Sequence, residues 1–158
     1  MKRLLLLSAV VAASATGIVP ARADHVPAVM THTSPDDLKW RDYPEIPGLQ
    51  LIILKGNPRE AGPYTLRVRF GPGVMSRPHW HPEERWITVL KGPWYAGAGE
   101  KFDPATTTPM PTGSFVIHHA KQIHYDGAKD QEVIVQISGI GPSATIFAHP
   151  EDDVQKRK

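Results

Sequence analysis

The chain has 158 residues, of which 41% are hydrophobic, and this length and composition are typical of a single globular domain. Its formal net charge is only +2, and no basic run with interleaved aromatic residues precedes the terminal Lys-Arg-Lys, so we expect no nucleic-acid partner. The absence of cysteine excludes disulfides, thiolate catalysis and cysteine-bound metals.

Residues 1–23 have the features of a secretory signal peptide. Lys2 and Arg3 precede an apolar stretch over residues 4–19, and small residues flank the predicted cleavage site after Ala23. A membrane anchor is the less favoured alternative, because Ser, Thr and Gly interrupt a stretch shorter than the ~20 residues of a spanning helix. Cleavage would remove three bases and no acid, so the mature chain would carry one more acid than base. We therefore expect a periplasmic or secreted protein that does not associate with the membrane.

Short strands separated by glycine and proline are predicted along most of the remaining chain. Residues 24–35 mix proline, threonine and histidine without periodicity, which predicts an extended or disordered arm before a domain over 36–148 and a polar tail over 149–158. The strand patterns cover residues 49–54, 65–70, 86–90, 94–100, 114–118, 132–138 and 144–147, and residues 101–113 are predicted to form a loop. No stretch has a helical period, so the fold class is all-β, a sandwich or a barrel.

Two histidines one residue apart form the first candidate metal motif. In a strand, side chains repeat with period two, so His79 and His81 project from one face and can bind the same ion. Gly73 precedes this pair by six positions, and Gly92 closes the predicted hairpin that follows it. A second motif, PTGSFVIHHAKQIHYD from residues 111 to 126, adds a third histidine, His124.

These spacings resemble the two motifs of the cupin superfamily, and more narrowly the small single-domain cupins with an HWHP-ER-W-TVL-G signature and a GSFV strand. The resemblance covers residues 38–147 and implies a double-stranded β-helix, or jelly-roll barrel, that binds its metal inside. Two departures stand out. Arg85 occupies the place of the usual cupin glutamate, and His119 and Lys121 replace the usual proline and glycine of the second motif.

We predict that His79, His81 and His124 bind one divalent metal ion. Imidazole suits iron, manganese, copper, nickel, cobalt and zinc, so the ligands do not select among them. Three histidines alone are the favoured ligand set, and the alternative is a bulge before Arg85 that turns Glu84 inward as a fourth ligand. The bulge is less favoured because shifting the strand would turn its apolar residues outward.

Three further residues are candidates for roles beside the metal. Arg85 is expected to face the barrel interior and to orient a substrate carboxylate through its planar guanidinium. The alternative is a surface ion pair with Glu83 or Glu84. His118 and His119 lie on opposite strand faces, so at most one faces inward, and His119 is our candidate for a catalytic role. Tyr125 is another candidate, although an aromatic residue in a strand is more often part of the core.

The favoured function is that of an exported, metal-dependent cupin oxygenase of the dioxygenase type, acting on a small organic molecule such as a carboxylate. Three histidines leave open coordination positions for a substrate and dioxygen, and the resemblance includes dioxygenases with such a ligand set. The alternative is a non-catalytic module that binds or senses a small ligand or a metal in the same cavity. The expected partner is a small molecule, and the resemblance also raises a homodimer, since many cupins are dimers.

Overall fold

The computed structural model of the chain describes residues 29–153. The predicted signal peptide, most of the predicted arm and residues 154–158 lie outside the described residues. The chain divides into two compact units, residues 1–34 and 35–158. In the first unit, the described residues 29–34 form no helix or strand. Within residues 29–153, no helix is long and apolar enough to cross a membrane.

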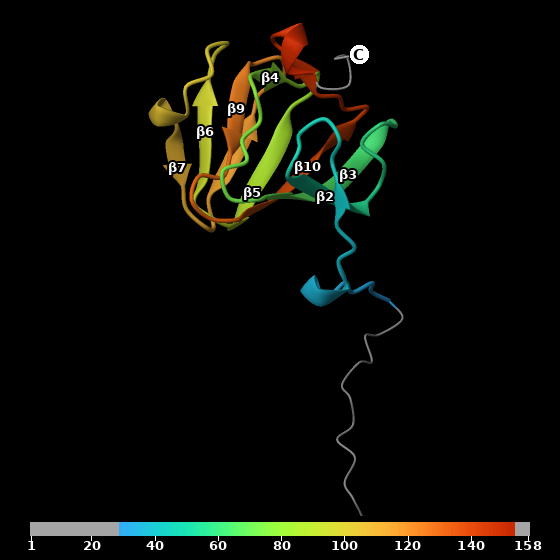
Figure 1. Cartoon of the computed structure of the whole chain (residues 1–158). Helices are drawn as coiled ribbons and strands as arrows, with labels where there is room; N and C mark the ends of the chain where they lie inside the picture. The colour runs from blue at the N-terminus through green and yellow to red at the C-terminus, as the bar shows by residue number, and fades with distance from the viewer. Residues whose placement is uncertain (1–28, 154–158) are drawn as a thin grey trace, which may run out of the picture. The chain divides into compact units, whose positions relative to one another are not determined.

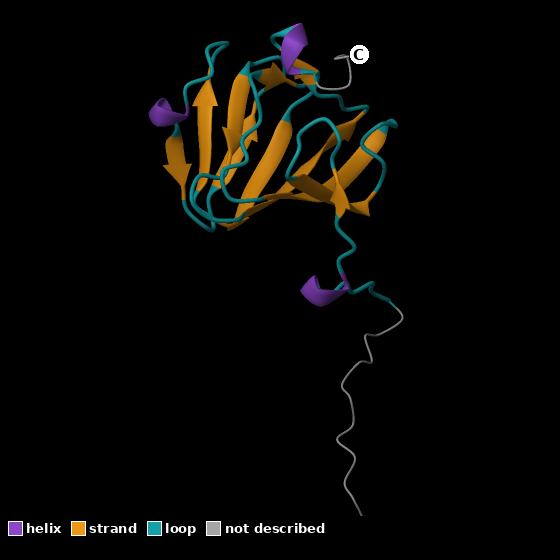
Figure 2. Ribbon diagram, viewed as in Figure 1, coloured by secondary structure: helices purple, strands orange, loops and turns teal. Residues whose placement is uncertain are grey.

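Two antiparallel sheets make up the second unit (Figures 1 and 2). The six-stranded sheet has the order β1 (Arg41–Asp42), β2 (Leu49–Lys55), β3 (Gly62–Phe70), β10 (Val133–Gly141), β5 (Arg85–Lys91) and β8 (Phe115–His118). The five-stranded sheet has the order β11 (Ile146–Phe147), β4 (His79–Trp80), β9 (His124–Gly127), β6 (Trp94–Ala98) and β7 (Thr108–Met110). Three short 3-10 helices complete the described part: η1 (Pro35–Asp37), η2 (Pro104–Thr106) and η3 (Pro150–Asp152). The predicted all-β jelly roll is confirmed.

One predicted loop contains a strand. Residues 101–113 are rich in proline and threonine, yet Thr108–Met110 forms β7, which pairs with β6 at the edge of its sheet. Proline lacks an amide donor, but an edge strand needs donors on one side only. The proline-based prediction of a loop is therefore wrong for these three residues.

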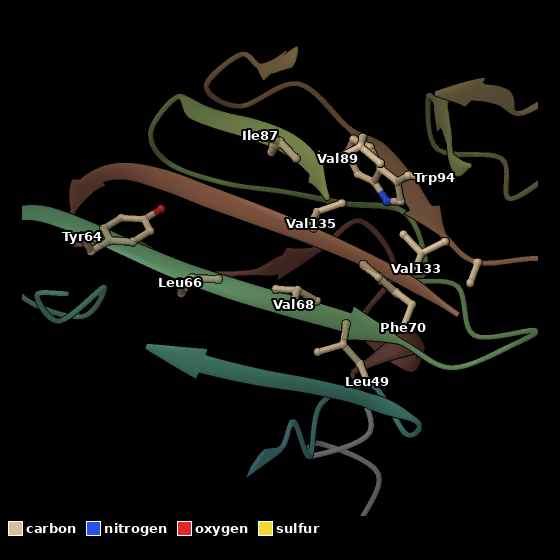
Figure 3. Packing of buried hydrophobic residues seen from close by; sticks show 11 residues of the cluster. Leu49, Tyr64, Leu66, Val68, Phe70, Ile87, Val89, Trp94, Val133 and Val135 are labelled. Atoms are coloured by element: carbon tan, nitrogen blue, oxygen red, sulfur yellow. The ribbon is translucent and has the colours of Figure 1, made fainter. Parts of the chain in front are cut away.

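The hydrophobic core lies between the sheets and draws mainly on alternate residues of β3, β5 and β10. Leu66 and Val68 of β3 pair in register with Ile137 and Val135 of β10, and Val135 in turn lies opposite Val89 of β5. Figure 3 shows the side chains of Leu66, Val68, Val89 and Val135 on these neighbouring strands, within the buried cluster. Because period-two alternation sends every second residue of β5 inward, the same register that packs the core also determines how Arg85 is oriented.

Candidate metal centre

His79, His81 and His124 come together because β4 and β9 are neighbours. His79 pairs directly with His124 across the two strands, and His81 follows His79 by two positions. The three side chains are buried, with residue exposures of 5%, 3% and 7%. Their ring centroids lie 4.4 to 5.1 Å apart, and one potential ligand atom from each residue lies within 4.8 Å of the other two. The predicted three-histidine cluster is thus present in the structure.

Backbone carbonyls determine which ring nitrogen of each histidine faces the cluster. The Nδ1 atoms of His79, His81 and His124 lie 2.7, 2.8 and 2.9 Å from the carbonyl oxygens of Arg77, Ala144 and Gln122. A carbonyl oxygen only accepts, so each Nδ1 carries the proton and each Nε2 is the unprotonated nitrogen that can accept a hydrogen bond or bind a metal. The Nε2 of His124 is buried and has no hydrogen-bond partner among the described residues. A metal ion would satisfy this buried acceptor.

Burial keeps the cluster neutral. It lowers the pKa of His79 from 6.5 to about 3, and repulsion from His124 adds to the effect. Burial likewise lowers the pKa of His124 to about 4 and that of His81 well below its usual value, with the charge of Arg85 lowering both further. Neutral imidazole is the form that binds a metal, so the three rings are ready for coordination at neutral pH.

Two residues that the motifs do not assign as ligands extend the cluster. His118 and Asp126 form a second potential ligand group with His124, again with atoms within 4.8 Å of one another. The ring centroids of His118 and His124 lie 3.8 Å apart. Burial lowers the pKa of His118 to about 2. Burial raises the pKa of Asp126 to about 7, against the opposing charge of Arg85. Strand alternation could have identified Asp126, which follows His124 by two positions in β9.

Arg85 faces the interior, as predicted. Its Nη1 lies 3.0 Å from the Nε2 of His81, and its Nη2 donates a hydrogen bond to the hydroxyl of Ser143. Its Nε lies 3.6 Å from a carboxylate oxygen of Glu83, and the two side chains are only 15% and 17% exposed. The ion pair considered from the sequence therefore exists with Glu83, but it is largely buried.

A cavity of about 480 Å³ between the sheets opens onto this cluster. Its walls are mainly apolar and include Leu51, Leu66, Val68, Ile87, Val135 and Ile137. Its polar residues include His79, His81, Arg85, His118, Asp126 and Ser143. Tyr43 also lines the cavity and donates a hydrogen bond to Glu45, and burial together with this contact raises its pKa to about 12. Such a volume is in the range of pockets that enclose small organic ligands.

The profile of the ChrR cupin-like domain family matches residues 28–143. The chain belongs to this family. Its cupin barrel is similar to that of RemF, a polyketide cyclase from Streptomyces resistomycificus, with a TM-score of 0.64, 16% identity and coverage of 78% of this chain and 89% of that chain. A cupin-2 domain from Rhodospirillum rubrum has a TM-score of 0.59 at 14% sequence identity, with coverage of 78% of this chain and 82% of that chain. The DMSP lyase DddQ from Ruegeria pomeroyi DSS-3 has a TM-score of 0.58 at 17% sequence identity, with coverage of 72% of this chain and 62% of that chain. No curated protein sequence matches the chain.

At these identities the structural neighbours establish the cupin fold and leave the reaction open. The fold implies a metal, and the donor set of this chain fits one. Three neutral imidazoles present convergent Nε2 atoms, their Nδ1 atoms are held by the backbone, and one Nε2 lacks any other partner within residues 29–153. The residue at the usual acidic position of cupins is a base, which sets this centre apart from the common cupin pattern.

Glu84 does not supply the fourth ligand. Its side chain is 42% exposed, and its carboxylate accepts a hydrogen bond of 2.8 Å from the Trp86 indole and lies 3.2 Å from Nδ1 of His119. Arg85 keeps the alternation of the inward Ile87 and Val89 in β5, and the contacts with Trp86 and His119 hold the Glu84 carboxylate away from the histidine cluster. The prediction of three histidines without Glu84 agrees with this geometry.

The structure places His119 and Tyr125 outside the cavity. His119 follows β8 and its side chain is 70% exposed, so the inward histidine of the pair is His118. Tyr125 lies between the inward residues His124 and Asp126 and therefore points to the opposite face of β9. There its hydroxyl donates a 3.2 Å hydrogen bond to the carbonyl of Asp103. Neither side chain lines the cavity, which corrects both expectations.

Proposed function

We propose that this cupin is a metal-dependent enzyme for a small organic anion and that its reaction is an oxygenation. The observation that carries the proposal is the cluster of three neutral histidines, His79, His81 and His124, two of which, His79 and His81, line the cavity. His79, His81 and His124 would hold the ion, with His118 and Asp126 beside them. When bound, a redox-active ion of this kind supplies dioxygen chemistry and polarises a substrate oxygen.

Charge and shape indicate the substrate class. His79, His81 and His124 are neutral donors, so they leave the positive charge of a divalent ion uncompensated. Arg85 and Glu83 offset each other, and Asp126, with a pKa of about 7, offers at most one more negative charge. The cavity therefore favours an anion, and its apolar walls favour a hydrocarbon body. A small carboxylate or an enolate with an apolar portion meets both conditions.

A specific contact also supports a second candidate, a non-catalytic binding module. The Arg85 guanidinium lines the cavity and already contacts the Nε2 of His81, so hydrogen-bond donors for an anion are present there although Glu83 balances its charge. Such a cavity can bind an anionic ligand without any metal. The structural neighbours RemF and DddQ are a polyketide cyclase and a DMSP lyase, so similar barrels serve different reactions.

Metal content and oxygen consumption test the two candidates. The protein would be isolated from its own compartment for metal analysis, then stripped and reloaded with Fe²⁺, Mn²⁺, Cu²⁺ or Zn²⁺. We expect oxygen consumption with a panel of small aromatic and aliphatic carboxylates for at least one redox-active ion, and none with Zn²⁺ or in the His79→Ala variant. Carboxylate binding of equal affinity with and without metal, and no turnover with any ion, would instead favour the binding module.

We also propose that the chain is exported and that its mature form starts at Asp24. The support is the arrangement of residues 1–23, a basic start, an apolar stretch and small residues at the cleavage site. Mass spectrometry of the protein from extracytoplasmic fractions tests this, and a mature pool that retains Met1 would refute it. The homodimer raised by the family resemblance stays a prediction.

A further inference from the structure

Arg85 occupies an atom that the proposed metal needs. Nδ1 of His81 donates a hydrogen bond to the Ala144 carbonyl, so the Nε2 of this ring is unprotonated and acts as an acceptor. A guanidinium has only donors, and Nη1 of Arg85 lies 3.0 Å from that Nε2. One lone pair cannot serve an N–H group and a metal ion together. Coordination by His81 therefore requires Arg85 to leave it.

Glu83 offers the place to which Arg85 can move. Both carboxylate oxygens of Glu83 and the Nε of Arg85 are buried, and none of them has a hydrogen-bond partner among the described residues. Yet Nε lies only 3.6 Å from one of these oxygens, an ion pair that stops short of a hydrogen bond. A buried carboxylate without donors is costly, and a guanidinium can satisfy both of its oxygens through two parallel N–H groups. The contact is therefore incomplete as it stands.

We propose that Arg85 exchanges between two partners, His81 in the metal-free protein and Glu83 in the metal-loaded protein. This inference rests on the proposed metal site and adds to it a competition within the chain. While no ion is bound, Arg85 donates a hydrogen bond to the Nε2 of His81. Once an ion has displaced Arg85, Glu83 stabilises its guanidinium by accepting hydrogen bonds from it. Glu83 is thus a positioning residue that acts on metal affinity through Arg85, without touching the ion.

Zinc affinity of four proteins tests the exchange: wild type, Glu83→Gln, Arg85→Gln and the double variant. We expect Arg85→Gln to bind zinc about tenfold more tightly, because the competitor for His81 is gone. Glu83→Gln should bind about tenfold more weakly, because displaced Arg85 loses its partner. In the Arg85→Gln background, Glu83→Gln should have little further effect. Glu84→Gln is the matched control. It removes the same charge from the next residue, whose side chain is exposed, and should leave zinc affinity unchanged.

Crystal structures with and without zinc supply the second readout. We expect Nη1 of Arg85 to leave His81 and both Glu83 oxygens to accept from the guanidinium in the zinc form. The exchange is refuted if Arg85 stays on His81 while zinc binds the histidines, or if Glu83→Gln weakens binding by the same factor in both backgrounds, as simple charge effects would. Zinc binding by Arg85→Gln but not by wild type would also refute it, because Arg85 would then be a permanent occupant. The proposed metal site itself falls only if neither protein binds zinc at the histidines.

Discussion

At the scale of single residues, the backbone determines the chemistry of the histidine cluster. His79 and His124 each donate through Nδ1 to a carbonyl two residues earlier, so the local chain path orients both rings. His81 instead uses the carbonyl of Ala144, in the segment between β10 and β11. The neighbouring Ser143 accepts from Arg85. One segment thus holds both His81 and the arginine that contacts it, a link that neither sequence motif predicts.

Removing either histidine of the β4–β9 pair should abolish the effect of zinc on stability. A ligand at 100 times its Kd adds about 2.7 kcal/mol to the free energy of unfolding. We expect this gain in the wild-type protein and no measurable gain in His79→Ala or His124→Ala, because each loses a nitrogen ligand. Thermal unfolding with and without Zn²⁺ measures it.

His119→Ala is the control for those two variants, because this exposed histidine lies outside the cavity. It should keep the whole zinc-dependent gain. A loss of the gain in His119→Ala, or its retention in both other variants, would contradict the assignment of the ligands.

The sequence predicted the members of the histidine cluster better than the residues around them. Period-two alternation within one strand pairs His79 with His81, and it correctly turns Arg85 inward. The same rule could not decide which of the adjacent His118 and His119 faces inward, because that depends on how β8 pairs with β5. In the structure Arg85 lies opposite His118, which settles the orientation. The partner role of Glu83 depends on the path of a corner that has no periodicity.

At the scale of elements, β6 and β9 show how close packing on the outer sheet face positions the site. A Cβ at Gly97 of β6 would lie 2.3 Å from the ring of Tyr125, which pairs with it across the strands. The Tyr125 ring lies over Gly97 on this face, whereas on the other face Asp126 lines the cavity and the His124 ring contacts His79 and His118. The sequence pattern predicted a strand that contains Gly97, but it did not predict the Tyr125 ring that leaves no room for a larger side chain at this position.

Gly97→Ala should therefore destabilise the protein by about 1–3 kcal/mol, the usual cost of overpacking. Urea unfolding measures the change. In a Tyr125→Ala background the added methyl group has room, so the same substitution should cost much less. An equal cost in both backgrounds would mean that the effect comes from the strand backbone and not from the tyrosine ring.

At the scale of the whole molecule, the buried titratable groups couple stability to pH. The histidines have folded pKa values far below 6.5, so between pH 6.5 and 4 the unfolded chain binds more protons than the folded one. Stability of the metal-free protein therefore falls as the pH falls through this range, by up to about 1.4 kcal/mol per histidine per pH unit. Asp126 has the opposite sign, since its pKa is raised from 3.8 to about 7, but the histidines outnumber it.

Denaturation of the metal-free protein at several pH values between 4 and 7 tests this coupling. We expect the free energy of unfolding to decrease steadily toward pH 4. His118→Leu should make the decrease shallower because it removes one buried titratable group, whereas the exposed His119→Leu should leave the slope unchanged. A slope that is flat, or that is equally reduced by both variants, would contradict the burial of these histidines as neutral groups.

The fold as a whole was easier to predict than the site, because it depends on many alternating strands while the site depends on a few contacts. The two motifs indicated a cupin barrel, and the family match and both sheets agree with it. Strand β7 was missed because proline obscured it at an edge position. The buried Arg85–Glu83 pair could not be separated from a surface pair without the corner geometry.

We expect His79, His81 and His124 to bind one metal ion through their Nε2 atoms. Anomalous diffraction from crystals of the zinc-loaded protein, recorded on both sides of the zinc absorption edge, tests this assignment. The prediction is one strong peak per chain, about 2.0–2.1 Å from each of the three Nε2 atoms. No peak at this position, or zinc found only at exposed groups such as the Glu84 and His119 pair, would contradict it.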